Sequence, residues 1–163
     1  LQYRNARPVT GPDKAPVHQD FELDYEIPQE HYFWEMASEL QSVFKPLLEK
    51  YQIAGDDSDD FRVNDLIVQR YPPGCSGSTP HRDHIEYRMV ILILLLSGDG
   101  DFRIHPERDE TTGEIIDFHP GQLFMMGAPG LSPGFVRPFH SVRNISDVRR
   151  TIGMRYDRRL AHF

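Results

Sequence analysis

The feature that most constrains the fold is a change of character after residue 60. From there on, short segments rich in β-branched and aromatic residues alternate with turns such as "SGDGD" and "GAPGLSPG". These segments predict strands at 61–71, 88–97, 102–105, 114–118, 122–126, 136–142 and 149–156. Many short strands separated by turns are typical of an antiparallel barrel or sandwich.

The residues before this region predict a helix preceded by an irregular arm. Between Pro28 and Tyr51, apolar residues recur every three or four positions, which is typical of an amphipathic helix. Pro46 predicts a kink or a break in that helix. Residues 1–20 are rich in proline and show no periodicity, so we expect an irregular lead-in. The predicted fold class is therefore mainly β with an N-terminal helix.

The length of 163 residues favours a single domain over residues 1–163. Within it, residues 1–60 are expected to form an arm and a helix that packs on the outside of the barrel. Residues 61–157 are expected to form the core of the domain, which carries the chemistry.

The charge distribution disfavours a nucleic-acid partner. Residues 1–80 hold 14 acidic and 7 basic side chains, and residues 81–163 hold 11 of each. Proteins that grip a polynucleotide normally present a basic face, because they neutralise phosphates. Fifteen of the 18 basic residues are arginine, however, and seven of them lie between Arg137 and Arg159, so a local anion-binding patch stays open.

Two features bear on the compartment. The single cysteine, Cys75, excludes an internal disulfide and favours a reducing, cytoplasmic location. The longest apolar run, residues 89–96, is too short to cross a bilayer as a helix, and no basic-then-apolar leader opens the chain. We therefore expect no membrane partner, and no feature of the sequence sets the oligomeric state.

The segment "STPHRDHIEYR" (78–88) raises the possibility of a metal site. Side chains two apart on an extended strand project to the same side, so His81 and Asp83 could reach one point while Arg82 faces away. A further histidine has to come from elsewhere, and the downstream candidates are His84, His105, His119, His140 and His162. His140 stands out because it lies in a predicted strand that an arginine-bearing strand follows.

Two imidazoles and one carboxylate form the facial triad of non-haem Fe(II) oxygenases, which leaves coordination positions open. An isolated HxD also occurs in polar surface turns. The order of features along this chain is more specific than an isolated HxD. It runs from the HxD through an apolar strand, Gly-Asp turns, "HPGQLFMM" and His140 to a closing strand "RRTIGMR". Over residues 61–157 this order resembles the Fe(II)/2-oxoglutarate-dependent dioxygenases, with the alkylation-repair and prolyl-hydroxylase-like branches closest in pattern.

That resemblance implies a double-stranded β-helix (jelly roll) with Fe(II), 2-oxoglutarate and O₂ as cofactors. It assigns the metal to His81, Asp83 and His140. The stretch "LIVQRYPPG" resembles the alkylation-repair pattern Asn-x-Tyr-x-x-Gly, with glutamine in the asparagine position, which implicates Gln69 and Tyr71 in holding 2-oxoglutarate.

The closing strand resembles the Arg-x5-Arg of the same branch, with Arg149 and Arg155 as the pair, and this resemblance implicates both in binding 2-oxoglutarate. Strand alternation places Arg149, Thr151, Gly153 and Arg155 on the inner face, and Arg150, Ile152, Met154 and Tyr156 on the other. Arg149 is therefore the expected partner of the distal carboxylate of 2-oxoglutarate, with Arg150 as the alternative. Arg155 could instead meet the substrate or pair with an acidic neighbour.

The resemblance implies an enzyme that hydroxylates or demethylates a C–H bond and releases succinate and CO₂. The substrate is expected to be a small molecule or a protein side chain, with residues 75–78 and 127–138 as loops at the rim. Two alternatives stay open. One is a cupin-like metalloenzyme that does not use 2-oxoglutarate, and the other is a non-catalytic jelly-roll binding module.

Overall fold

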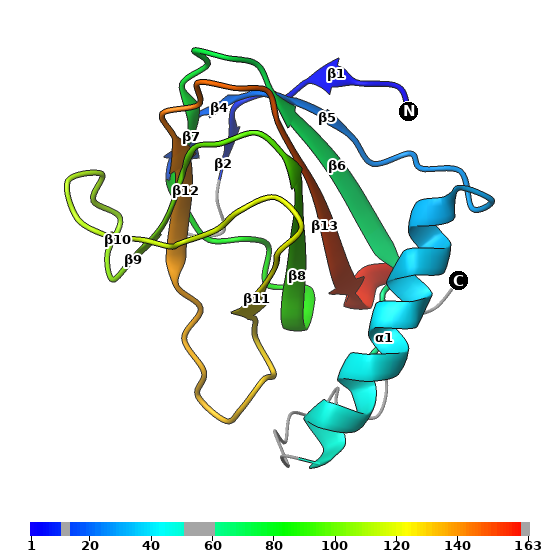
Figure 1. Ribbon diagram of the computed structural model, residues 1–163. Coiled ribbons are helices and arrows are strands. Elements are labelled where there is room, and N and C mark those ends of the chain that lie inside the picture. The colour runs from blue at the N-terminus through cyan, green and yellow to red at the C-terminus, as the bar shows by residue number, and fades with distance from the viewer. Residues whose placement is uncertain (11–13, 51–60, 161–163) are drawn as a thin grey trace.

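A computed structural model of the chain describes residues 1–10, 14–50 and 61–160 (Figure 1). Two predicted features, the helix end at Tyr51 and the candidate ligand His162, lie outside these residues. Among the described residues, no helix has the length and apolar character needed to cross a bilayer.

Two antiparallel sheets make up most of the structure. The major sheet has six strands in the spatial order β1 (Arg4–Asn5), β5 (Glu22–Asp24), β6 (Asp65–Tyr71), β13 (Arg149–Asp157), β8 (Tyr87–Ser97), β11 (Leu123–Gly127). The minor sheet has five, in the order β10 (Glu114–Ile115), β9 (Asp101–His105), β12 (Phe139–Arg143), β7 (Gly77–His81), β4 (Gln19–Asp20). A separate pair joins β2 (Val9–Thr10) to β3 (Pro16–Val17), and a short 3-10 helix, η1 (Arg158–Leu160), follows β13.

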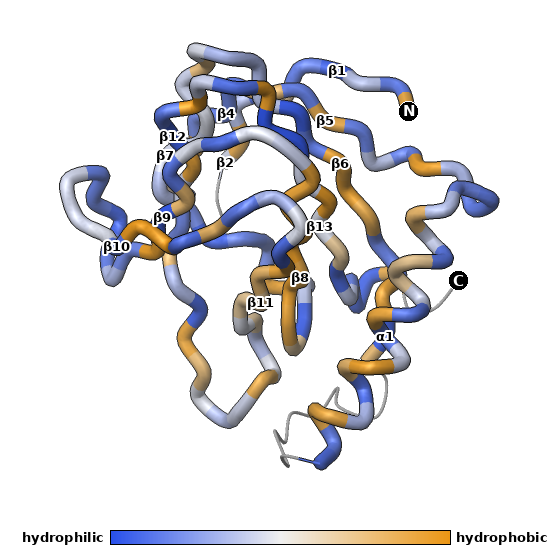
Figure 2. The backbone as a smooth tube through the Cα atoms, in the orientation of Figure 1, coloured by the Kyte–Doolittle hydropathy of each residue, from blue (hydrophilic) through white to orange (hydrophobic). Residues whose placement is uncertain are grey.

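Strand β8 explains the long apolar run of the sequence. It lies inside the major sheet, between β13 and β11, and Met89, Leu92 and Leu95 are fully buried. A strand that is covered on both faces is apolar at successive positions and does not alternate. In Figure 2, β8 is accordingly orange along much of its length.

The helix α1 (Tyr32–Lys50) lies along the outer side of the major sheet (Figure 1). Its buried residues Ala37 and Leu48 share a core with Ile152 and Met154 of β13. The helix therefore covers the face of β13 that carries Ile152 and Met154. Pro46 was predicted to kink or break the helix. The helix continues through Pro46 to Lys50, so it does not break there, and the kink stays a prediction.

The described part of residues 1–20, predicted to be an irregular arm, contains short strands, and a further strand follows it. Strand β4 extends the minor sheet next to β7, and β5 extends the major sheet next to β6. The segment "FELD" (21–24) explains the second pairing, because Phe21 and Leu23 alternate with charged residues as in a half-covered strand.

Strand β7 was also missed, because its sequence "GSTPH" looks like a loop. Gly77 has a positive φ of 73°, and a Cβ there would collide with the carbonyl oxygen of Val142 in β12. Glycine thus permits the close approach of β7 to β12. As a consequence, residues 77 and 78 of the expected rim loop 75–78 belong to a strand.

Candidate active site

Neighbouring strands bring the two predicted histidine ligands together. His81 is the last residue of β7, and its Cα partner across the sheet is His140 of β12. The centroids of the two rings lie 4.3 Å apart. Asp83 lies just beyond the end of β7 and not on the expected extended strand, yet its carboxylate still faces both imidazoles.

The donor set suits a metal ion. Asp83 Oδ1 lies 3.8 Å from His81 Nε2 and 3.7 Å from His140 Nε2, and one ligand atom from each residue lies within 4.8 Å of the others. Direct hydrogen bonds would be shorter than these separations. Ligands bound at about 2.1 Å to one ion are about 3–4 Å apart. Two imidazoles and one carboxylate therefore fit an ion such as Fe(II), with further positions left for other ligands.

The orientation of His81 and the protonation of His140 also fit metal binding. The Nδ1 atom of His81 donates a hydrogen bond to the carbonyl oxygen of Thr79 at 2.7 Å, so Nε2 is the ring nitrogen that faces Asp83. Burial, together with the nearby His81, lowers the pKa of His140 to about 4, so this imidazole is neutral near pH 7. Burial works to raise the pKa of Asp83, but His140, His81 and Arg155 outweigh it and hold that pKa below its usual range.

These residues open onto an internal cavity of about 130 Å³ between the two sheets. The cavity walls include all seven of the predicted site residues: Gln69, Tyr71, His81, Asp83, His140, Arg149 and Arg155. Thr151 and Gly153 line the same cavity, as the predicted alternation of β13 requires, whereas Arg150 is exposed. The structure therefore favours Arg149 over Arg150 as an arginine that faces the interior.

Arg149 is a buried cation without an acidic partner among the described residues. It is 1% exposed, its Nη1 donates to the backbone carbonyl of Asp99 at 3.3 Å, and its Nε has no hydrogen bond. Burial lowers the pKa of this guanidinium below its usual range, against the nearby Tyr71 and Asp99, which raise it. Because an uncompensated buried charge is strongly destabilising, this end of the cavity is suited to an anion from solution.

Gln69 and Tyr71 lie beside Arg149 on β6. Tyr71 is the Cα partner of Arg149, and Gln69 that of Thr151, whose hydroxyl donates to the Gln69 side-chain oxygen at 3.1 Å. Tyr71 is buried and packs on Phe21, with ring centroids 4.6 Å apart. Burial raises the pKa of Tyr71, so its phenol is neutral and can donate a hydrogen bond.

Arg155 lies on the cavity wall but already has an acidic partner. Its Nε donates to Asp65 Oδ2 at 2.6 Å, its Nη2 contacts the same oxygen, and its guanidinium lies 4.2 Å from the ring centroid of Tyr87. The acidic neighbour that the sequence left open for Arg155 is thus Asp65. Its predicted contact with 2-oxoglutarate stays a prediction.

The sequence did not identify the residues that the first strands add to the cavity wall. Gln19 of β4, Phe21, and Leu23 of β5 all line it. The alternation in "FELD" was an available signal, although it is short. The buried aromatic Phe102 of β9 is a further wall residue that was not singled out.

The other three candidate histidines that the structure describes do not join the metal ligands. His84 and His119 are exposed, and His119 Nε2 pairs with Asp117 at 2.6 Å. His105 is buried, but it is absent from the cavity wall and bonds to Ser141 at 2.8 Å. A structural or surface role agrees with these positions.

A scan of the sequence against protein-family profiles and a search of curated proteins each return no match. Solved structures do match. A prolyl hydroxylase from Trichoplax adhaerens, in complex with a hypoxia-inducible-factor degradation-domain peptide, aligns with a TM-score of 0.61 at 16% identity, over 98% of this chain and 72% of the other.

Two further hydroxylases align in the same way. A Pseudomonas putida prolyl-4-hydroxylase has a TM-score of 0.56 at 13% identity, over 85% of this chain and 71% of the other. The collagen prolyl hydroxylase of Paramecium bursaria Chlorella virus-1, in its 2OG complex, has a TM-score of 0.54 at 17% identity, over 84% and 78%. The chain therefore has the double-stranded β-helix fold of the Fe(II)/2-oxoglutarate-dependent oxygenases, as predicted.

Proposed function

We propose that the protein is an Fe(II)- and 2-oxoglutarate-dependent dioxygenase that oxidises a C–H bond of its substrate and releases succinate and CO₂. The proposal rests on the residues that line one cavity. Three metal-ligand side chains converge in it, and a buried arginine without an acidic partner among the described residues lines the same cavity. The first group suits Fe(II), and the second suits a dicarboxylate.

Each residue has a defined task in this proposal. His81, Asp83 and His140 hold Fe(II), which when bound supplies the activation of O₂. Arg149 binds the distal carboxylate of 2-oxoglutarate through paired hydrogen bonds, and Tyr71 donates a further one. Gln69 is oriented by Thr151, and the apolar walls keep bulk water away from the oxidant.

The buried arginine also separates this function from the alternative of a cupin-like enzyme without an oxo acid. Such an enzyme needs the metal ligands but has no use for a cation buried away from them. The proposed substrate is a small molecule or a protein side chain. The proposed location is a reducing compartment. The free thiol of Cys75 is compatible with that location.

The test is succinate release from 2-oxoglutarate across a panel of amino acids, peptides and methylated nucleosides, with the His81→Ala variant as the blank. We expect one substrate class to stimulate turnover in the wild type and none to do so in the variant. If folded protein supplied with Fe(II) under anaerobic conditions retains no stoichiometric iron, the proposal is wrong.

A further inference from the structure

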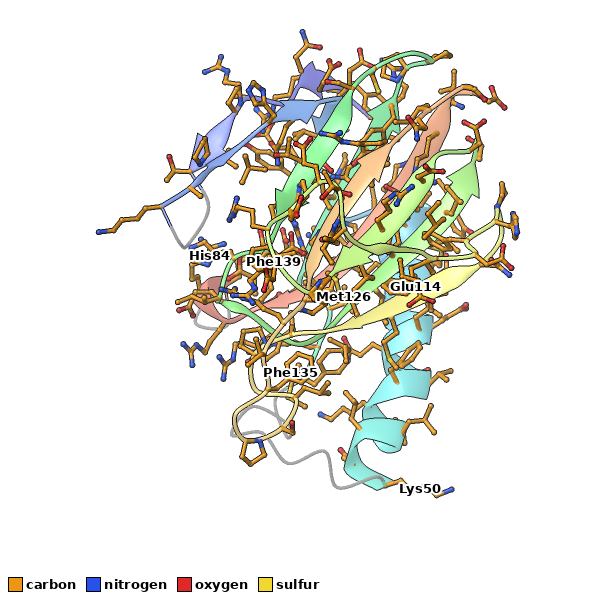
Figure 3. The ribbon with its side chains drawn as sticks, turned by 90° about the vertical axis from the view of Figure 1, so that its left-hand side faces the viewer. Lys50, His84, Glu114, Met126, Phe135 and Phe139 are labelled. Carbon is orange, nitrogen blue, oxygen red and sulfur yellow. The ribbon has the colours of Figure 1, made fainter. Side chains whose placement is uncertain are left out.

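A second groove, of about 600 Å³, opens beside the metal cavity at the N-terminal strands. Gln19 of β4 and Leu23 of β5 line both the groove and the metal cavity. In Figure 3 the N-terminal strands, coloured blue, lie above His84, the chain neighbour of the ligand Asp83. A molecule in this groove would therefore contact residues that also face the candidate metal centre.

Strand pairing places the groove and the cavity on the same face of the major sheet. Arg4 of β1 is the Cα partner of Leu23. Leu23 is the Cα partner of Gln69 of β6, which is in turn that of Thr151. Side chains at paired positions project to the same face of a sheet. Because Leu23, Gln69 and Thr151 line the cavity, Arg4 projects to the cavity side, at the edge of the sheet.

The wall of the groove carries positive charge. It includes Arg4 and Arg7 and, among the described residues, no aspartate or glutamate. The two acidic residues of β5 are engaged elsewhere. Glu22 accepts a hydrogen bond from Arg70, and Asp24 accepts two from backbone amides. An anion is therefore the ligand whose charge complements this wall.

Arg4 presents hydrogen-bond donors that solvent reaches. Its guanidinium carbon Cζ lies 4.1 Å from the centroid of the Tyr25 ring, which helps to hold the group in place. Its side chain is 47% exposed, and its Nη2 lies 3.9 Å from a carboxylate oxygen of Glu26, too far for a hydrogen bond. Arg7 is exposed, and no described residue forms an ion pair with it. Both cations are thus accessible to a ligand.

The rest of the groove wall is largely apolar. Ala6, Val9, Leu23 and the ring of Tyr25 line it, and Val9 is 47% and Tyr25 52% exposed. The groove also has the size of a small-molecule site, for which about 300–1,000 Å³ is usual. These features suit a small molecule that has an apolar body and an anionic group.

We propose that this groove binds the substrate, and that the substrate is a small organic acid. Its carboxylate or phosphate group contacts Arg4 and Arg7, and its apolar body passes Gln19 and Leu23 toward the metal. The proposal rests on the oxygenase function above and specifies its substrate class. Since Arg149 is assigned to 2-oxoglutarate, the two acids occupy different arginines and do not compete.

The experiment is a titration of metal-free protein with naphthylacetate, followed by ligand-observed NMR. Naphthylacetamide has the same body without the charge, and naphthyl phosphate decides between the two acid groups. The variant is Arg4→Gln, with Arg4→Lys as the conservative change. The matched control is Arg62→Gln. Arg62 is exposed and also lies over a tyrosine ring, 5.8 Å from the centroid of Tyr156, but it is outside the groove.

We expect at least one of the two acids to bind the wild type about tenfold more tightly than the amide. Arg4→Gln should weaken that acid about tenfold, and Arg4→Lys should weaken it less. Arg62→Gln should leave the affinity within about twofold, since only long-range charge changes. The proposal is overturned if neither acid binds, if the amide binds as tightly, or if Arg4→Gln and Arg62→Gln weaken binding equally. Tighter binding of oligoglutamate than of either acid would overturn it as well.

Loading the protein with Mn(II) tests the connection to the metal centre. A bound paramagnetic ion broadens the NMR signals of nearby protons, so the aromatic signals of the bound acid should broaden in the wild type and stay sharp in His81→Ala. Sharp signals from an acid bound to Mn(II)-loaded wild type would contradict a groove that leads to the metal. If the acids bind through Arg4 but the protein retains neither Mn(II) nor iron, the oxygenase function alone is wrong.

Discussion

The two ends of strand β13 hold arginines with opposite surroundings. Arg149 and Arg155 lie on the same face of one strand and line the same cavity. Both guanidinium groups lie near an aromatic ring, Tyr87 for Arg155 and Phe118 for Arg149. Arg155 is paired with Asp65, whereas Arg149 has one long hydrogen bond to a carbonyl and no acidic partner among the described residues. One end of the cavity is thus neutralised by the fold, and the other depends on an anion from outside.

The two arginines are therefore expected to have different roles: Arg155 contributes to the stability of the fold, and Arg149 binds a ligand. A paired buried charge destabilises the fold when its partner is removed, because the remaining charge is left uncompensated. An unpaired buried charge is already unfavourable, so its retention is better explained by a ligand than by stability. We therefore expect substitution of Arg155 to change the free energy of unfolding, and substitution of Arg149 to change the affinity for 2-oxoglutarate.

The largest effect is expected from Arg155→Met. It leaves the Asp65 carboxylate, whose side chain is 17% exposed, without its cation, and we expect the free energy of unfolding to fall by about 3 kcal/mol. Chemical denaturation measures this change. The double variant Asp65→Asn/Arg155→Met should recover part of the loss, and a double variant no more stable than Arg155→Met would contradict the pairing.

The next effect is expected from Arg149→Met. The substitution removes the unpaired cation at similar volume, so the stability of the ligand-free protein should stay level or rise. The dissociation constant of 2-oxoglutarate, measured calorimetrically with Mn(II) in place of iron, should increase about 100-fold, or about 2.7 kcal/mol. A large loss of stability with unchanged 2-oxoglutarate affinity would show that Arg149 stabilises the fold and does not bind the cosubstrate.

A smaller effect is expected from Thr151→Val. This substitution keeps the shape of the side chain but removes the hydroxyl that donates to Gln69. We expect about 1 kcal/mol less stability and a several-fold weaker 2-oxoglutarate affinity, because the Gln69 amide loses its orientation. Thr151→Ser, which keeps the hydroxyl, is the control. Equal affinities in the Val and Ser variants would remove Gln69 from the proposed cosubstrate site.

Local patterns in the sequence predicted those parts of the site that depend on strand periodicity. The inward position of Arg149 follows from alternation along "RRTIGMR", and His81 and Asp83 are close in the chain. The pairing of Arg155 with Asp65 joins residues 90 positions apart, and no local sequence pattern predicts such a contact. Strand β7 was missed because its sequence has no strand pattern, and its pairing with β12 and β4 makes it a strand.

The first strands show the same limit. Phe21 and Leu23 line the cavity, and the proline-rich residues 1–20 just before them predicted an irregular arm. The strands on either side of Phe21, β4 and β5, are two and three residues long and are stabilised by pairing with β7 and β6. Segments this short carry too little periodicity to be identified before their neighbours are known.

The central claim is that one cavity holds both Fe(II) and 2-oxoglutarate. Anaerobic titration of the wild type with the metal and the oxo acid, followed by visible absorbance, tests it most directly. We predict a weak charge-transfer band that needs both components, is absent in His81→Ala, and requires a far higher 2-oxoglutarate concentration in Arg149→Met. A folded wild type that shows no such band at saturating concentrations of both would contradict the account.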